Sequence, residues 1–307
     1  MIISDTGKVG PGLYVLGTSR MPVYLLDGGR PVIFDAGLSC LGPTYKNDIA
    51  KTLDGRSPEI LFLTHVHFDH CGSAAYLKKA FPGLKIAGSK QAAEILTRPN
   101  ALKLMAVRNN TAREGVRKWA PHLVSNEVFQ PFTIDRVLSD GDRIELKDGL
   151  SVEVLATPGH TRDSLSYYMP KQKILVAAES AGSADVTGYI FSEFLSDYQA
   201  YIDSIHRLAG LEVEILCQGH RLVLTGKDAK DFFGRSLQAA GEFRGLLEEF
   251  LRSEGGDIQK VIAKIKAIEY DPKPEPRQFE LSYLLNIEIL VRHIAQRMEK
   301  DSNSRPT

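Results

Sequence analysis

Short apolar runs separated by turn residues dominate the first part of the chain. Residues 13–16, 23–26 and 32–34 are rich in Val, Leu, Ile and Tyr, and an Asp-Gly-Gly turn at 27–29 separates the last two runs. Runs of this length that are bounded by glycine are typical of strands joined by hairpins. The pattern therefore predicts an antiparallel sheet near the N-terminus.

The pattern then changes from strand to helix twice. Helical spacing of apolar residues over 43–53 is followed by an apolar run at 59–63, which ends in the polar Thr64. Helical spacing returns over 73–80. A buried strand, a polar loop and a helix are predicted here, and the loop between strand and helix is where functional side chains gather.

A second group of strands is predicted in the middle of the chain, after an Asp-Gly-Asp turn at 140–142. These strands cover residues 144–146, 152–156, 165–169 and 174–177. Between the two groups, residues 92–126 are charged and helical in spacing, with breaks at Pro99 and Pro121. We interpret this segment as a helical insertion between two halves that are each rich in sheet.

After one more strand at 213–216, the chain is predicted to be helical almost to its end. The expected helices cover residues 229–253, 258–268 and 277–300, so that 227–300 forms a C-terminal extension to a first domain of 1–226. The last helix carries apolar residues at helical spacing: Phe279, Tyr283, Leu284, Ile287, Leu290, Val291 and Ile294. This face packs onto the same chain, or it forms a lid or a homodimer contact. The polar tail 301–307 is expected to be disordered.

Composition excludes several classes of protein. In 307 residues, 38 Lys and Arg balance 38 Asp and Glu. The chain therefore has no net positive charge that would attract nucleic acid or an anionic membrane. No apolar run approaches the roughly 18 residues of a membrane helix, and the N-terminus shows no secretory signal, so a cytoplasmic location is expected. Cys40, Cys71 and Cys217 form no Cys-x-x-Cys pair, which predicts reduced, structural thiols.

The segment 64–70, Thr-His-Val-His-Phe-Asp-His, is the strongest chemical signal in the sequence. It brings three imidazoles and one carboxylate, the donors that divalent transition metals prefer, into six positions. His65 and His67 are two apart on an extended segment, so their side chains point to the same side. The run therefore predicts a metal site directly after the strand 59–63.

The remaining candidate donors also follow predicted strands. His160 lies in the Pro-Gly-His-Thr turn at 158–161, Glu179 follows the strand 174–177, and His220 follows Gly219 after the strand 213–216. Together with the first segment they supply enough ligands for two metal ions that share a bridging group. The other three histidines are expected to be structural or on the surface: His122, His206 and His293.

On these motifs the chain resembles the metallo-β-lactamase superfamily. The resemblance rests on the His-x-His-x-Asp-His run at 65–70, the turn at 158–161, the acidic Glu179 and the Gly-His pair at 219–220, and it covers about residues 10–225. It implies an α/β (α+β) fold, a four-layer αββα sandwich with the metals at one edge of the sheets. The helices of 227–300 would then be an extension of that sandwich.

The resemblance also implies a ligand set. The first metal would be held by His65, His67 and His160, the second by Asp69, His70 and His220, with Glu179 in the place of the bridging carboxylate. The family usually has aspartate there, commonly after glycine, whereas this chain has Ala178 and Glu179. Because glutamate is one methylene longer, it can bridge, bind one metal only or weaken the second site. The metal count therefore stays open.

Two further acidic residues are weaker candidates. Asp185 lies in the loop after Glu179 and is a less favourable substitute for it. Asp35 follows the strand 32–34 and resembles a family position that supports the ligands, although a structural turn explains it equally well. Cys71, next to the ligands, is expected to be structural because no partner cysteine is near in the sequence.

Two divalent cations, zinc foremost with iron or manganese as alternatives, imply hydrolysis. They lower the pKa of a shared water toward about 7 and polarise the scissile carbonyl or phosphoryl oxygen. Asp69 has a further catalytic role in this hypothesis, because a carboxylate beside that water can orient it and pass on its proton.

The substrate follows only from the resemblance. The helical C-terminus is similar to that of superfamily members that act on acyl thioesters, including glyoxalase II-like enzymes and the quinolone-signal response thioesterase. The prediction is therefore a hydrolase of a small acyl or aryl thioester. Apolar residues after Glu179 either line its pocket or belong to the core: Tyr189, Ile190, Phe191, Phe194, Leu195 and Tyr198.

Other functions stay open. A lactonase or phosphodiesterase of the same superfamily has the same donors. A non-catalytic metal-binding regulatory protein is the alternative from another class, and Asp69→Asn would discriminate it by leaving binding intact with no hydrolysis to lose. An oxygen- or nitric-oxide-reducing diiron protein is disfavoured, because the chain has no flavin-binding extension and keeps His67 where those relatives carry an acidic ligand.

Overall fold

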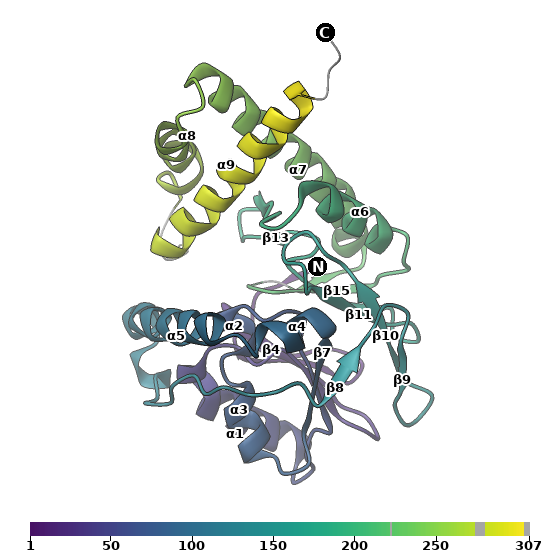
Figure 1. Cartoon of the computed structure of the whole chain (residues 1–307). Helices are drawn as coiled ribbons and strands as arrows, with labels where there is room; N and C mark the ends of the chain where they lie inside the picture. The colour runs from purple at the N-terminus through teal and green to yellow at the C-terminus, as the bar shows by residue number, and fades with distance from the viewer. Residues whose placement is uncertain (222, 274–279, 304–307) are drawn as a thin grey trace.

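Two seven-stranded sheets lie face to face in the computed structural model, which describes residues 1–221, 223–273 and 280–303 (Figure 1). The first sheet has the order β2 (Gly7–Gly10), β3 (Leu13–Thr18), β4 (Met21–Leu26), β5 (Val32–Phe34), β6 (Ile60–Phe62), β7 (Lys85–Ser89), β8 (Arg136–Leu138). The second has the order β1 (Ile2–Ile3), β16 (Val223–Thr225), β15 (Ile215–Gln218), β12 (Ile174–Ala178), β11 (Leu165–Met169), β10 (Ser151–Ala156), β9 (Arg143–Glu145). Both sheets are mixed, since β5, β6, β7 and β8 run parallel, as do β12 and β15.

Alternation of side chains along the strands divides the core. In β4, Tyr24 and Leu26 belong to the cluster between the two sheets, whereas Val23 and Leu25 belong to the cluster on the outer face of the first sheet. Both faces are apolar because successive residues of a strand point to opposite sides and both sides are covered. The strands predicted as hairpins near the N-terminus are thus buried on both faces of the first sheet.

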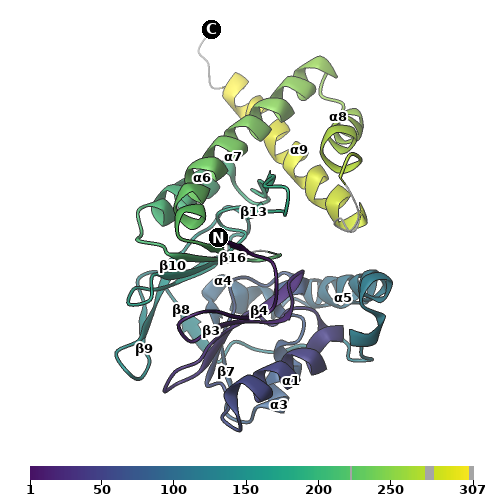
Figure 2. The same cartoon turned by 180° about the vertical axis from the view of Figure 1, so that it is seen from behind.

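Helices cover both outer faces, as Figures 1 and 2 show. The cluster outside the first sheet includes residues of α1 (Gly42–Leu53), α2 (Phe68–Cys71), α3 (Ala74–Ala80), α4 (Lys90–Ile95) and α5 (Pro99–Trp119), with 3-10 turns at Ser39–Leu41 and Pro121–Leu123. The cluster outside the second includes residues of α6 (Tyr198–Ala209), α7 (Lys227–Ser253), α8 (Ile258–Ile265), a π-helical turn (Lys266–Tyr270) and α9 (Glu280–Asn303). The predicted four-layer αββα sandwich with a helical C-terminus is confirmed.

The helices of the insertion at 92–126 are interrupted at the prolines, as predicted. Helix α4 ends before Pro99, α5 begins at Pro99, and the next turn begins at Pro121. Strand β15 begins two residues later than predicted. Seven short strands of the described part of the chain were not predicted from the sequence, because each is a short run without clear alternation: β1, β2, β7, β8, β13 (Ser183–Ala184), β14 (Ile190–Phe191) and β16. These strands are set by pairing with neighbours rather than by local pattern.

The C-terminal helices pack onto the second sheet. On α9, Tyr283, Ile287 and Val291 are buried in the same cluster as Leu216 of β15. Phe279, expected on this face, lies outside the described residues. Helix α9 continues to Asn303, three residues into the tail expected to be disordered, and residues 304–307 also lie outside the described part.

Two smaller features complete the fold. Strands β13 (Ser183–Ala184) and β14 (Ile190–Phe191) form a hairpin beside α7. All three cysteines are buried and free, in agreement with structural thiols.

None of the described helices is long and apolar enough to span a membrane.

Candidate metal centre

The histidine-rich loop after β6 is fixed by one buried carboxylate. Asp35, held at a φ of 61°, accepts hydrogen bonds from the main-chain N–H of Thr64 at 2.8 Å and from its hydroxyl. The same carboxylate lies 2.8 Å from Nδ1 of His70, so that Nε2 of this ring faces the centre of the site. Asp35 thus orients a predicted ligand from behind, as metal sites commonly require.

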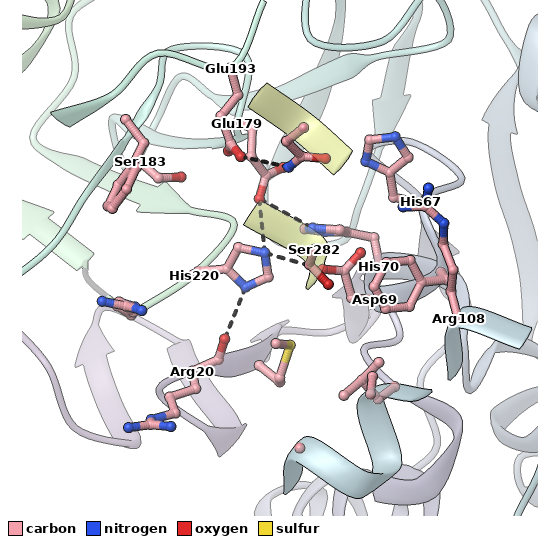
Figure 3. A pocket seen from close by; sticks show the side chains of 18 of the residues that line it. Arg20, His67, Asp69, His70, Arg108, Glu179, Ser183, Glu193, His220 and Ser282 are labelled. Carbon is pink, nitrogen blue, oxygen red and sulfur yellow. Dashed lines mark hydrogen bonds and ion pairs between the residues drawn. The ribbon is translucent and has the colours of Figure 1, made fainter. Parts of the chain in front are cut away.

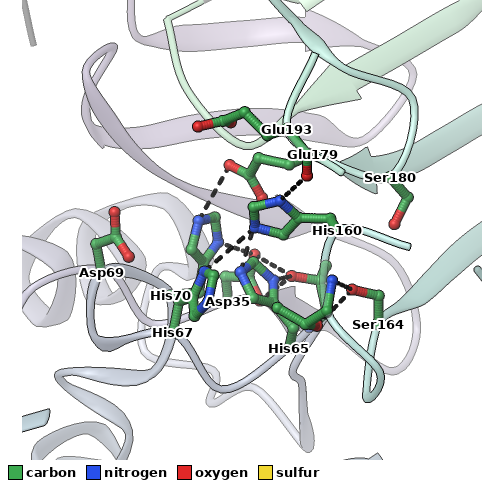
Figure 4. A network of polar contacts seen from close by, with 12 residues as sticks. Asp35, His65, His67, Asp69, His70, His160, Ser164, Glu179, Ser180 and Glu193 are labelled. Atoms are coloured by element: carbon green, nitrogen blue, oxygen red, sulfur yellow. Dashed lines mark hydrogen bonds and ion pairs between the residues drawn. The ribbon is translucent and has the colours of Figure 1, made fainter. Parts of the chain in front are cut away.

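A first group of three rings gathers His65, His67 and His160 (Figure 4). One nitrogen of each lies within 4.8 Å of the others, and Nε2 of His160 is 3.2 Å from Nδ1 of His67. His160 follows β10, and its Nδ1–H donates to the main-chain carbonyl of Glu193 at 2.8 Å, which leaves Nε2 as the acceptor nitrogen that faces the group. Three converging imidazole acceptors are a suitable donor set for zinc.

A second group consists of Asp69, His70 and His220. Nε2 of His220 lies 3.5 Å from Oδ2 of Asp69, and its Nδ1–H donates to the main-chain carbonyl of Arg20 at 2.9 Å (Figure 3). Asp69 and His70 belong to the short helix α2, and His220 follows β15. Two segments far apart in the sequence thereby complete the group.

Glu179 lies between the two groups. Its carboxylate oxygens are 3.8 Å from Nε2 of His65, 3.2 Å from Nε2 of His70 and 3.3 Å from Nε2 of His220. The structure thus brings together every donor predicted from the sequence, with the glutamate carboxylate within 4 Å of a histidine from each of the two groups.

The buried atoms of this cluster fit a metal. Among the described residues, Nε2 of His65 and both carboxylate oxygens of Glu179 make no hydrogen bond of good geometry and face only the other donors of the cluster, although both side chains are about 98% buried or more. Leaving such groups unpaired in the interior costs free energy. Neutral imidazole nitrogens and carboxylate oxygens are donors that a divalent cation would accept, so the residues present fit a bound metal.

The local backbone accommodates the longer side chain of Glu179. Strand β12 has a register shift between Val176 and Ala178, and Ala178 adopts a φ of 45°, a left-handed conformation that favours glycine. On the opposite side, a Cβ on Gly219 would lie 1.8 Å from Oε1 of Glu179. Asp185 instead accepts from the N–H of Thr187 at 2.9 Å and takes no part in the donor groups found in the described residues.

Electrostatics keep His67 and Glu179 in their ligating forms, whereas burial is outweighed by nearby carboxylates at His70 and His220, and the pKa of each of these two rings is raised. Burial lowers the pKa of His67 to about 3, so this ring is neutral at pH 7. Burial alone would raise the pKa of Glu179, but the neighbouring His70 and His220 outweigh it and hold the pKa below its ordinary value. Neutral imidazole and ionised carboxylate are the forms that bind metals.

The cluster forms the floor of a pocket whose walls come from the helical segments (Figure 3). Helix α5 contributes one face, with Arg108, Ala112, Val116 and Trp119, and helix α9 contributes Ser282 and Asn286. The insertion and the C-terminal extension thus enclose the metal site from two sides.

The apolar residues after Glu179, for which pocket and core were both open, divide between the two. Phe191 lines the pocket. Ile190, Phe194 and Tyr198 are buried in the core of the second sheet, with Leu195 packed against them, and the hydroxyl of Tyr189 contacts Glu269. The aromatic run packs against α6 and α7 because these helices cover the sheet at this point.

Sequence analysis missed Glu193. Its main-chain carbonyl accepts from His160, and its side chain lines the pocket, where Oε1 accepts from Nδ2 of Asn286 on α9 at 3.2 Å. Burial raises the pKa of its carboxyl. The only available signal was an acidic residue inside an aromatic run.

The remaining histidines are away from the cluster: His122 and His206 are exposed, and Nε2 of His293 accepts from the N–H of Tyr198.

Comparison with known proteins identifies the family. The sequence profile of the Metallo-beta-lactamase superfamily matches residues 21–220, which include every donor described above. The chain belongs to the metallo-β-lactamase superfamily.

Individual relatives share less than a third of their residues with this chain. The chain is 28% identical over 211 residues to the acyl-coenzyme A thioesterase MBLAC2 of Gallus gallus, over 66% of this chain and 73% of that protein. A metallo-beta-lactamase family protein from Thermus thermophilus has a TM-score of 0.63 with 20% identity over 94% of each chain. A superfamily protein from Sulfolobus tokodaii has a TM-score of 0.59 with 19% identity, over 93% of this chain and 98% of that one. These structural similarities concern the fold.

Proposed function

We propose that this chain is a metal-dependent hydrolase of an acyl or aryl thioester. The observation that carries the proposal is the convergence of five imidazoles and two carboxylates at the floor of a half-apolar pocket, where three buried donor atoms make no hydrogen bond among the described residues and face only other donors of the cluster. The similarity to an acyl-coenzyme A thioesterase supports the thioester as substrate.

The residues divide into ligands and supports. His65, His67 and His160 would hold one cation, and Asp69, His70 and His220 the other, with Glu179 between them. Zinc suits this set best, and iron and manganese also accept it. When bound, such cations supply an activated water at neutral pH and polarise the carbonyl under attack.

The chain's own residues add orientation and proton handling. Asp35 holds the ring of His70, and the carbonyls of Arg20 and Glu193 hold those of His220 and His160. The second oxygen of Asp69 is available to orient the attacking water and to accept its proton. The apolar face of α5 excludes water from the acyl group once it is bound.

Two measurements test the proposal. Elemental analysis of protein purified without chelator is expected to find two equivalents of zinc, iron or manganese per chain. Hydrolysis of a panel of coenzyme A and glutathione thioesters is expected, and Asp69→Asn is expected to lower kcat by at least about 100-fold. Turnover of lactones or phosphodiesters with none of thioesters would overturn the substrate class, and absence of metal would overturn the site.

A further inference from the structure

The walls of the pocket carry positive charge. Arg20, Arg108 and Arg221 all line it, although the chain as a whole has no net charge. Figure 3 shows Arg108 on the side of His67, whereas Arg20 lies below His220. The arginines therefore flank the metal-binding floor rather than forming a single cluster.

Two of these guanidinium groups are available to a ligand. In the described part of the chain, no hydrogen bond or ion pair engages the guanidinium of Arg108, which lies 5.9 Å from the ring centre of Phe68. By contrast, Arg117 on the same helix pairs with Glu114 at 2.6 Å. An arginine in a pocket wall without an internal carboxylate is suited to an anion from outside.

Arg221 is placed by an uncommon backbone conformation. Its φ is 69°, and its main-chain N–H donates to the carbonyl of Ser19 at 2.6 Å. Burial lowers the pKa of Arg221, and the negative charge of Asp185 opposes this only in part. Oδ2 of Asp185 instead lies 3.4 Å from Nζ of Lys273. A left-handed conformation in a residue other than glycine costs free energy and is typical of functional sites.

The acidic groups of the pocket are already engaged. Asp69 and Glu179 face the histidines, and Glu193 accepts from Asn286. The hydroxyl of Ser183, in contrast, is buried, lines the pocket and has no partner among the described residues. The pocket thus offers unused donors and an apolar wall, which fit an apolar ligand with an anionic end.

We infer that Arg108 and Arg221 select thioesters that carry an anionic group, either a carboxylate on the acyl part or a phosphate on the thiol part. The inference rests on the proposed thioester hydrolysis and adds the charge of the substrate to it. Arg108 is the residue to test, because it belongs to the helical insertion and lies outside the set of metal donors and their supports.

The test compares Arg108→Gln with the matched variant Arg117→Gln. Three thioesters separate the two sources of charge: benzoyl-N-acetylcysteamine, which is neutral, 4-carboxybenzoyl-N-acetylcysteamine and benzoyl-coenzyme A. Arg108→Gln is expected to lower kcat/KM about tenfold for one charged substrate and to leave the neutral one unchanged, because one charge-assisted hydrogen bond is lost. Arg117→Gln is expected to change none of them.

Loss on the carboxylated substrate assigns the anion to the acyl part, and loss on benzoyl-coenzyme A assigns it to the thiol part. Equal values for both variants on all three thioesters would overturn the inference while leaving the proposed function intact.

Binding separates failure of the inference from failure of the proposed function. If no thioester is hydrolysed, the proposed function fails, and calorimetry with terephthalate and benzoate still tests the arginine. Terephthalate carries a second carboxylate, so its affinity is expected to fall about tenfold in Arg108→Gln, whereas that of benzoate is unchanged. Equal affinities of terephthalate for the two variants would overturn the assignment of Arg108 to a carboxylate on the acyl part.

Discussion

The floor of the pocket differs from its walls in how each side chain is held. On the floor, the rings of three donors are each fixed by a group behind them: Asp35 behind His70, the carbonyl of Glu193 behind His160 and the carbonyl of Arg20 behind His220. On the walls, Arg108 has no hydrogen-bonding partner in the described structure. The floor is therefore preorganised for chemistry, whereas the walls are open to a ligand and can change without disturbing the metals.

The origins of the two regions differ as well. Floor residues lie on loops and on the short helix α2 that follow strands of the two sheets, whereas many of the wall residues belong to α5 of the insertion and to α9 of the C-terminal extension. Rigid strand ends position reactive groups, and added helices adapt the surface around them. Substitutions on the floor are thus expected to remove activity, and substitutions on the walls to alter selectivity.

The largest effect is expected for His65→Ala. His65 belongs to the first donor group and also to a further group with His70 and Glu179, so its loss removes a donor from both. Because loss of a residue that merely supports a ligand costs 10- to 100-fold, loss of this donor is expected to lower metal affinity and kcat by more than about 100-fold. Elemental analysis after dialysis checks this, with the exposed His206→Ala as control. Two equivalents of metal in His65→Ala would contradict the ligand assignment.

A somewhat smaller effect is expected for Gly219→Ala. The new Cβ would lie 1.8 Å from Oε1 of Glu179, and the backbone of Gly219 is not at positive φ, so the effect comes from the clash alone. Displacement of the carboxylate is expected to lower the metal count toward one and kcat by about 10- to 100-fold.

A second substitution tests the cause. Glu179→Asp shortens the side chain by one methylene, so the double variant Gly219→Ala/Glu179→Asp is expected to recover part of the metal content. Gly245→Ala, where a Cβ meets open space, is the control. No recovery in the double variant would show that Gly219 acts in some other way.

Most of the floor could be predicted from the sequence, and most of the walls could not. His65, His67 and His70 form a local motif, and His160, Glu179 and His220 follow strands whose ends meet at one edge. Metal binding restricts these positions to a few residue types, which makes them recognisable in the sequence. The residues that line the walls are not restricted in this way.

The missed residues show the reason. Asn286 and Glu193 are more than 90 positions apart and meet only because α9 packs against the second sheet. The role of Gly219 depends on where the carboxylate of Glu179 lies in space. Strands β7 and β8 were missed for the same reason, since each is defined by its neighbours rather than by its own pattern.

A moderate effect on the walls is expected for Asn286→Ala. The hydrogen bond of 3.2 Å to Glu193 links α9 to the pocket, so its loss is expected to raise KM about three- to tenfold with metal content unchanged. Steady-state kinetics on the best thioester checks this, with the exposed Gln296→Ala on the same helix as control. A loss of metal would instead show that α9 supports the floor.

The smallest effect concerns the backbone beneath Glu179. Ala178 and Ala177 are neighbouring buried alanines, but only Ala178 has a positive φ, of 45°. Replacing either by glycine removes the same methyl group and adds the same freedom to the unfolded chain. The free energies of unfolding of the two metal-free variants are therefore expected to differ by the left-handed strain, about 1 to 2 kcal/mol in favour of Ala178→Gly. Chemical denaturation measures both; equal values would mean that the conformation at Ala178 costs nothing and that Glu179 is carried on an unstrained strand end.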